Sequence, residues 1–312
     1  MMNNIAFIFA YRRNVDKWST PLSIVNEFNA RGWNTHIVSL FDNNGQYSPN
    51  ELIHFIENYE DVFIPDIVMY MDYGQFDHHL LGNHSIPSAF WVSEMGDEPQ
   101  NYDKNIIKAH KFDLLLTPDY PSYLKYKQHG YNVEWWTHWA DSNIHDHYFN
   151  FDYYPPVRST RGPGGSQLMD YLSQVMPDKF INRNGLVGTD YGSFLNTGKI
   201  TFQQSRWNEI TRRIFEGMAC GTMVLTDRLP KHTRIDDLFT EGEDIVYYDN
   251  VSEAISKINY YLWNKEERER IASNGYNKVI KQHTQANRVD SILIQYEKFK
   301  QTQSTRSTSM VV

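Results

Sequence analysis

Residues 212–230 read RRIFEGMACGTMVLTDRLP, and this stretch decides which fold we expect. It begins as an amphipathic helix, continues into small side chains at positions 217 and 219–221, and ends in an apolar run over residues 222–225. Small side chains allow a helix end to lie close to a neighbouring backbone, and Gly221 suits the left-handed residue that follows many helices. The stretch therefore predicts a helix seated against a parallel sheet, with residues 222–225 as the next strand.

The predicted helix spans residues 208–220 and has Asn208 as its N-cap. Apolar side chains recur every four residues in a stripe that faces the sheet, namely Ile210, Ile214 and Met218. Charged side chains occupy another face, namely Glu209, Arg213 and Glu216. A surface ion pair would account for these charges. A glycine in mid-helix, Gly217, costs about 1 kcal/mol, however, and indicates close approach of a ligand or of another backbone.

The first half of the chain alternates short apolar runs with helix signals. We expect strands at residues 5–9, 35–39, 66–70, 88–92, 114–116 and 133–136. Thr20 before Pro21 predicts a helix N-cap with proline at the first helical position, and residues 48–51 predict a capping box. Strands that alternate with capped helices pair in parallel through right-handed crossovers, so we expect a Rossmann-like α/β domain.

The second half repeats this alternation after residues 150–166, where proline, glycine and serine are concentrated as in a linker. Further strands are expected at residues 185–188, 199–202, 222–225 and 244–247, and further helices at 167–175, after a capping box at Asn264, and from Gln285 to about Lys298. The run at 162–166 predicts either a serine-capped loop or a nest of amides for phosphate. We thus predict Rossmann-like domains over residues 1–150 and 151–300, and a flexible tail over 301–312.

Composition restricts the class of protein. The content of hydrophobic residues, 40%, and of charged residues, 22%, is typical of a soluble globular enzyme. The net charge of −8 argues against general electrostatic capture of nucleic acid or anionic membrane, although a local basic cleft is compatible with it. The single cysteine excludes an intrachain disulfide, and no apolar run reaches the roughly 18 residues that a membrane span needs. We therefore expect a cytoplasmic protein.

The second half resembles a known family. The resemblance is carried by residues 199–202, 205–209, 212–221 and 225–230 and continues more sparsely to about residue 290. These residues look like the C-terminal domain of GT-B glycosyltransferases, and the most similar subgroup is that of spore-maturation-protein-like (CgeB-like) glycosyltransferases. The resemblance implies two Rossmann-like domains that face each other across a cleft, with the C-terminal helix packing back on the first domain.

The resemblance also implies a ligand and a site. The ligand is a nucleotide-diphospho-sugar, with a UDP-sugar as the expected donor, and no further cofactor or metal. Glu216 would bind the ribose hydroxyls and Arg213 the phosphates, since a carboxylate accepts two hydroxyl donors and a guanidinium matches phosphate oxygens. The remaining expected donor-binding residues are Arg206, Ser205, Trp207, Asn208, Thr211, Lys199 and Gly188. Asn208 stands where many relatives have a second glutamate, so stereochemistry is not inherited.

Catalysis needs an acceptor hydroxyl to lose its proton, and the first domain supplies carboxylates for this. Asp97 and Glu94 follow the fourth expected strand, and ligands of parallel sheets bind at the carboxyl ends of strands. We take Asp97 as the preferred general base, with Glu94 second; a role as loop carboxylates or caps is the alternative. His138, His145 and His147 cluster without the spacing of a common zinc site.

Three functions are compatible with these observations. A glycosyltransferase is our first hypothesis, with an acceptor that is a protein, a lipid-linked glycan, a small molecule or a modified nucleic-acid base. A non-catalytic module that binds nucleotide sugars is the second, and a sugar-nucleotide epimerase of similar architecture is the third. No Walker loop, nucleophile elbow or dinucleotide fingerprint follows the first strand, which argues against NTPases, hydrolases and dehydrogenases.

Overall fold

The computed structural model describes residues 3–12, 16, 19–42, 44–72, 86–92, 112–145, 155–160 and 167–309. The chain divides into two compact units. Unit 1 comprises Met1–Thr137 and Ala286–Val312, and unit 2 comprises His138–Gln285. This division differs from the expected boundaries near residues 150 and 300, because the chain enters the second unit earlier and its C-terminal helix returns to the first.

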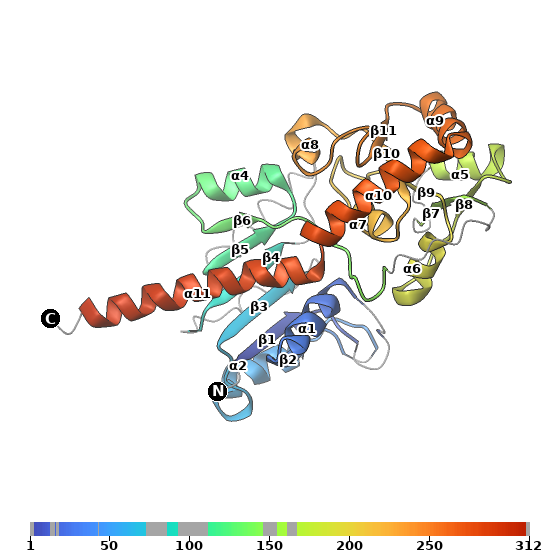
Figure 1. Cartoon of the computed structure of the whole chain (residues 1–312). Coiled ribbons are helices and arrows are strands. Elements are labelled where there is room, and N and C mark those ends of the chain that lie inside the picture. Colours follow the sequence, from blue (N-terminus) through green and yellow to red (C-terminus); the bar gives the residue numbers. More distant parts are fainter. Residues whose placement is uncertain are drawn as a thin grey trace. The chain divides into compact units, whose positions relative to one another are not determined.

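Unit 1 contains a six-stranded parallel sheet in the order β2-β1-β3-β4-β5-β6 (Figure 1). Its strands are β1 (Asn4–Phe9), β2 (Asn34–Ser39), β3 (Ile67–Asp72), β4 (Ser88–Val92), β5 (Leu114–Thr117) and β6 (Val133–Trp135). Every expected strand of the first half is confirmed to within two residues. Their apolar runs are continuous because central strands of a parallel sheet are covered on both faces, and every residue of β4 and β5 is buried.

Three described helices accompany this sheet: α1 (Thr20–Ala30), α2 (Asn50–Val62) and α4 (Tyr120–Gln128). The N-cap of α1 is Ser19, whose hydroxyl accepts the N–H of Leu22, so the expected cap at Thr20 is wrong by one residue. The capping box at residues 48–51 is also wrong. Glu51 accepts the backbone N–H of Ser39 at 2.8 Å instead, which fastens α2 to the end of β2.

The C-terminal helix α11 (Gln285–Ser309) packs on unit 1, as expected. Asp290 pairs with Arg31 at 2.5 Å, and Ser291 accepts the indole N–H of Trp136 at 2.8 Å. The buried guanidinium of Arg288 donates to both the carbonyl and the hydroxyl of Thr137, and burial lowers its pKa to about 10. The helix continues to Ser309, so the expected end near Lys298 is wrong.

Unit 2 contains a five-stranded parallel sheet in the order β11-β10-β9-β7-β8. Its strands are β7 (Val157–Ser159), β8 (Phe180–Asn182), β9 (Ile200–Gln203), β10 (Met223–Asp227) and β11 (Val246–Tyr248). The sequence missed β7 and β8 because three residues are too short to show a periodic pattern. The expected strand at residues 185–188 is wrong: Gly185 and Gly188 have φ angles of 75° and 57°, which a strand does not accommodate.

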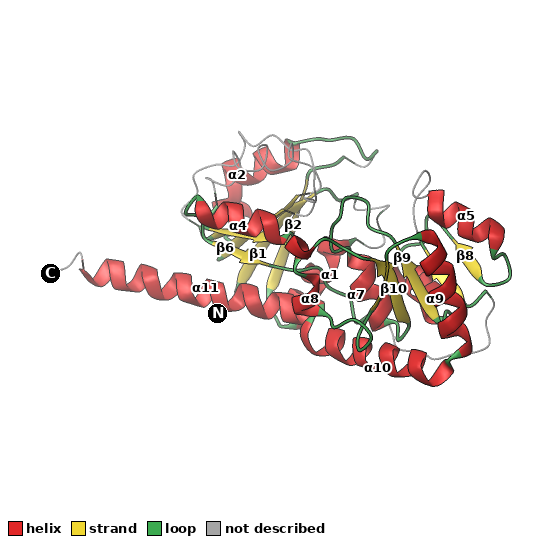
Figure 2. Cartoon of the chain, turned by 90° about the horizontal axis from the view of Figure 1, so that it is seen from above, coloured by secondary structure: helices red, strands yellow, loops and turns green. Residues whose placement is uncertain are grey.

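Helices cover both faces of the unit 2 sheet. One face packs in a core cluster with α5 (Gln167–Val175), α9 (Val251–Trp263) and α10 (Lys265–Gln282). The other face meets α6 (Gly188–Asn196) and α7 (Arg212–Ala219). Figure 2 shows β9 and β10 between α7 on one side and α9 on the other. The helix expected at 167–175 is confirmed; Asn264 is the N-cap position of α10 but makes no side-chain cap bond.

The helix α7 packs closely against the sheet, as its small residues predicted. A Cβ on Gly217 would lie 2.8 Å from Cγ2 of Thr201 in β9 and 3.0 Å from Cγ2 of Val224 in β10. The φ angle of Gly221 is 70°, the left-handed conformation expected after the helix. Close packing of the helix against the side chains of β9 and β10 therefore explains the glycine in mid-helix.

Candidate functional site

The topology of unit 2 indicates where a ligand binds. Ligands of doubly wound sheets bind outside the carboxyl ends of the strands, at the point where the strand order reverses. In unit 2 this point lies between β7 and β9, because the chain passes from β7 to the edge strand β8 but from β9 to β10 on the other side. Thr160 follows β7 there, residues 204–205 follow β9, and α7 begins on the same side.

Glu216 in α7 is a buried carboxylate that side chains from several segments of unit 2 approach. Glu216 is 1% exposed. The phenol of Tyr191 donates to its Oε2 at 2.8 Å, and Nε of Arg212 lies 2.7 Å from its Oε1. Nε2 of His145 lies 3.8 Å from the same oxygen. Tyr191 is also hydrogen-bonded to Thr160. We call these residues, Thr160, Tyr191, Arg212, His145 and Glu216, the Glu216 cluster.

The charges of the Glu216 cluster follow from burial and from these contacts. Burial by itself raises the pKa of Glu216, but Arg212, His145 and the bond from Tyr191 outweigh it, so the pKa is lower than usual and the group is ionised. Burial lowers the pKa of His145, although Glu216 opposes this. Nδ1 of His145 accepts the backbone N–H of Asp141 at 3.1 Å, so the neutral ring carries its proton on Nε2, which faces Glu216.

The start of α7 determines which arginine meets Glu216. The helix begins at Arg212 after Thr211, so the expected N-cap at Asn208 is wrong. Asn208 has a φ of 51°, a left-handed backbone that is incompatible with the extended conformation of an N-cap. Glu209 therefore does not share a helix face with the others, and the i, i+4 partner of Glu216 is Arg212.

Two members of the cluster come from distant segments that the sequence did not bring together. Tyr191 lies in α6, whose first residue is Gly188, and His145 ends a turn that begins at Asp141. A Cβ on Gly192 would lie 2.2 Å from the carbonyl oxygen of Ile144, so only glycine lets this turn approach α6 so closely. The sequence shows His145 only as part of a histidine cluster, and no sequence signal points to Tyr191.

The segment after β9 carries most of the other expected donor-binding residues. The backbone N–H and the hydroxyl of Ser205 both donate to Asp227, at 2.8 and 2.7 Å. The guanidinium of Arg206 lies 5.2 Å from the ring of Trp207, which is 40% exposed. Thr211 is buried at the N-cap position of α7, and its hydroxyl has no hydrogen-bond partner in the described part of the chain.

Other predicted site residues lie elsewhere in unit 2 or outside the described residues. Lys199 precedes β9, and its N–H donates to Pro156, which precedes β7, so Lys199 lies at the amino ends of the strands. The length of β9, about 13 Å at 3.3 Å per residue, separates it from Ser205. Asp97, Glu94, His147 and residues 162–166 lie outside the described residues.

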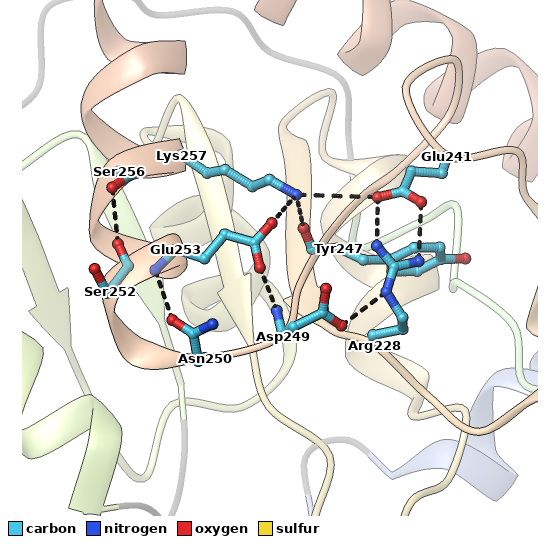
Figure 3. A network of polar contacts seen from close by, with 9 residues as sticks. All are labelled: Arg228, Glu241, Tyr247, Asp249, Asn250, Ser252, Glu253, Ser256 and Lys257. Atoms are coloured by element: carbon cyan, nitrogen blue, oxygen red, sulfur yellow. Dashed lines mark hydrogen bonds and ion pairs between the residues drawn. The ribbon is translucent and has the colours of Figure 1, made fainter.

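Arginines on this side of unit 2 differ in whether a carboxylate neutralises them. Arg228, which follows β10, pairs with Glu241 through two bonds of 2.9 Å and with Asp249 at 2.8 Å, and these bonds raise its pKa (Figure 3). The same network continues to Lys257, which pairs with Glu253 at 2.8 Å (Figure 3). Arg228 is therefore neutralised by the protein itself.

No ion pair with a described residue is formed by Arg158, Arg183, Arg206 and Arg213, nor by Arg270, which donates to the carbonyl of Gly242. Arg213 neighbours the cluster, and its charge contributes to the low pKa of Glu216. Arg158 in β7 is buried, and both it and Arg183 lie over the ring of Phe194, at 5.0 and 5.5 Å. This unneutralised positive charge favours an anionic ligand.

Comparisons with known proteins bear on the family and the fold of the chain. No curated protein matches the sequence. Residues 164–294 match the model of a protein family described as glycosyl transferase-like. That stretch contains Tyr191, Arg212 and Glu216, whereas His145 precedes it.

Similar solved structures cover nearly the whole chain. A sucrose-phosphate synthase from Thermosynechococcus elongatus has a TM-score of 0.69 at 10% identity, over 96% of this chain and 100% of that one. HepE from Anabaena, in complex with UDP and glucose, has a TM-score of 0.65 at 12% identity, over 95% and 100%. An alpha-glucosyltransferase in complex with UDP-glucose and DNA containing an abasic site has a TM-score of 0.65 at 9% identity, over 95% and 99%. The chain has the GT-B glycosyltransferase fold.

Proposed function

We propose that this protein is a glycosyltransferase that takes a sugar from a nucleotide-diphospho-sugar, with a UDP-sugar as the donor, and that unit 2 holds the donor. The observation that carries the proposal is the Glu216 cluster. It places an ionised, buried carboxylate at the strand-order reversal of a sheet whose sequence matches a glycosyl transferase-like family. The family-level match extends to the helix that carries Glu216.

Glu216 has the capacity for the ribose role that the resemblance implies. An ionised carboxylate offers about four acceptor sites. Tyr191 and Arg212 approach one oxygen each, and His145 is too distant at 3.8 Å for a hydrogen bond. Two sites thus remain for two hydroxyls. Tyr191 and Arg212 would then hold the carboxylate in place while it accepts the ribose.

We assign the diphosphate to Arg213, assisted by Arg206 and by the first amides of α7. Arg213 has no carboxylate partner among the described residues, and the amino end of a helix attracts anions. Charge stabilisation of this kind supports departure of the diphosphate without a metal ion, which is part of the proposal. Ser205, Trp207, Asn208, Thr211 and Gly188 are proposed to shape the surrounding surface.

The acceptor side is assigned to unit 1, with Asp97 as the proposed general base and Glu94 as the alternative. The acceptor class remains the set derived from the sequence: a protein, a lipid-linked glycan, a small molecule or a modified nucleic-acid base. No helix in the described part of the chain has the length and apolar character to cross a membrane. A cytoplasmic location is part of the proposal.

Calorimetry and a transfer assay test this function. Titration with UDP, GDP and ADP should show preferential binding of UDP. Incubation with a panel of UDP-sugars should then release UDP, by hydrolysis or by transfer to an added acceptor. Binding without release would favour a non-catalytic nucleotide-sugar module, and absence of binding to all three nucleotides would refute the proposal. An epimerase, which the family match favours less, would interconvert sugar nucleotides without an acceptor.

A further inference from the structure

Gln203 has a buried side-chain amide that has no hydrogen-bond partner among the described residues. It is the last residue of β9 and is 1% exposed. Neither Oε1 nor Nε2 meets a partner among the described residues. A primary amide has two N–H donors and an oxygen with two acceptor sites, and a buried polar group that stays unpaired is unfavourable. This unpaired amide therefore needs an explanation.

The threonine neighbours of Gln203 in β9 and β10 are paired. The hydroxyls of Thr201 and Thr222 lie 2.6 Å apart, and Thr222 also donates to the carbonyl of Gly217 at 2.8 Å. Thr226, which is opposite Gln203 in the register of β10 and β9, donates to Asp227 at 3.0 Å. The hydroxyls beside Gln203 are thus satisfied within the unit, whereas the amide at the carboxyl end of β9 is not.

The side chain of Gln203 lies on the α7 face of the sheet. Phe202 packs in the core cluster with α5, α9 and α10, so the alternation of a strand directs Thr201 and Gln203 to the opposite face. Thr201 contacts α7 at Gly217. Gln203 lies about 7 Å further along the strand, and the first residue of α7 lies about 8 Å from Gly217 along the helix. Gln203 is therefore level with the first turn of α7.

Gln203 also borders the Glu216 cluster. The register of β7 and β9 pairs Arg158 with Thr201, so Thr160 and Gln203 are level two residues further on. Neighbouring strands are about 4.8 Å apart. Thr160 is hydrogen-bonded to Tyr191, which donates to Glu216. The unpaired amide thus lies beside the group to which the proposed function assigns the ribose.

We propose that Gln203 hydrogen-bonds the nucleoside part of the donor. This inference rests on the proposed function. A single ligand group pairs both ends of an amide only if it donates as well as accepts hydrogen bonds. The ribose hydroxyls and the imide edge of uracil are such groups, whereas a phosphate only accepts and would leave Oε1 unpaired. Proximity to the Glu216 cluster favours the nucleoside over the transferred sugar.

Calorimetry with UDP and with UDP-glucose tests the role of Gln203. Gln203→Met keeps the length of the side chain and removes its polar atoms, and Gln203→Leu is a second variant should the first fold poorly. We expect each variant to bind UDP and UDP-glucose about tenfold more weakly, in line with the loss of about one hydrogen bond to a ligand. The melting temperature of the ligand-free variants should be equal to or higher than that of the wild type, since a buried unpaired amide is removed.

Gln174→Met is the matched control. Gln174 is exposed on α5, which covers the opposite face of the sheet, so this variant should bind both ligands as the wild type does. Unchanged UDP affinity in both Gln203 variants would overturn the inference. So would a loss confined to UDP-glucose, because the amide would then contact the sugar, or a lower melting temperature without loss of affinity. A wild type that binds no nucleotide would refute the proposed function itself.

Discussion

Replacement of Glu216 by glutamine is the sharpest test of the candidate site. The change keeps the size of the side chain and removes one charge from a carboxylate that is 1% exposed. It leaves Arg212, at 2.7 Å, without its partner, and it replaces an acceptor oxygen with an N–H donor. Both stability and nucleotide affinity should respond, each by an amount that the structure bounds.

The loss in free energy of unfolding depends on whether the charge of Arg212 stays buried or is solvated once Glu216 is replaced. Removal of one partner from a buried pair costs roughly 3–5 kcal/mol when the other charge stays buried. The side chain of Arg212 is 29% exposed, so water can solvate its charge, and we expect a smaller loss of about 2 kcal/mol. If Glu216 also accepts ribose hydroxyls, loss of one charge-assisted bond weakens UDP binding by roughly 10- to 100-fold.

The assay combines urea denaturation with calorimetric titration of UDP, and Glu266→Gln serves as control. Glu266 is exposed in the first turn of α10, so its replacement should change the free energy of unfolding by less than about 0.5 kcal/mol. The pKa of Glu216 is lowered in the folded chain. The stability it contributes is therefore present above the ordinary pKa of about 4.3 and is lost as the pH falls through the lower folded value.

The difference between wild type and Glu216→Gln should accordingly shrink below about pH 4. If Glu216→Gln has the same free energy of unfolding and the same UDP affinity as the control, then neither the stabilising effect of the buried charge pair nor its role in donor binding is correct. If stability falls but UDP affinity is unchanged, the pair is structural and the ribose is bound elsewhere.

Two further predictions concern the packing of α7 and the buried histidine. Gly217→Ala places a methyl group 2.8 Å from Cγ2 of Thr201 and should lower the free energy of unfolding, measured by urea denaturation, by about 1–3 kcal/mol. Thr201→Ser removes the methyl group that is met, so the double variant should recover part of this loss. If the effects of the two substitutions are simply additive, the contact is contradicted. The pKa of His145 is lowered on folding, so the unfolded chain binds the proton more readily and the free energy of unfolding should decrease as the pH falls below about 6.5. In His145→Gln the free energy of unfolding should depend less on pH. An unchanged pH dependence in this variant would show that another group causes it.

Much of the fold could be predicted from the sequence, because a strand that is buried on both faces consists of a continuous run of apolar residues. Residues 88–92 form β4 with the expected bounds, and α5 occupies the expected residues 167–175. The strands β7 and β8 have three residues each, too few for a period to show, and were missed. The capping boxes failed because Glu51 and Asn264 bond to other segments.

The candidate site could be predicted only in part. The sequence by itself determined that the segment around Glu216 forms a helix with small residues against a strand, since spacing and side-chain volume are local properties. Only the tertiary structure decided that this helix begins at Arg212, because the left-handed backbone at Asn208 ends the preceding segment. It also decided that Tyr191 and His145 approach the carboxylate. Strand register and crossovers bring such distant residues together, and no local pattern encodes that convergence.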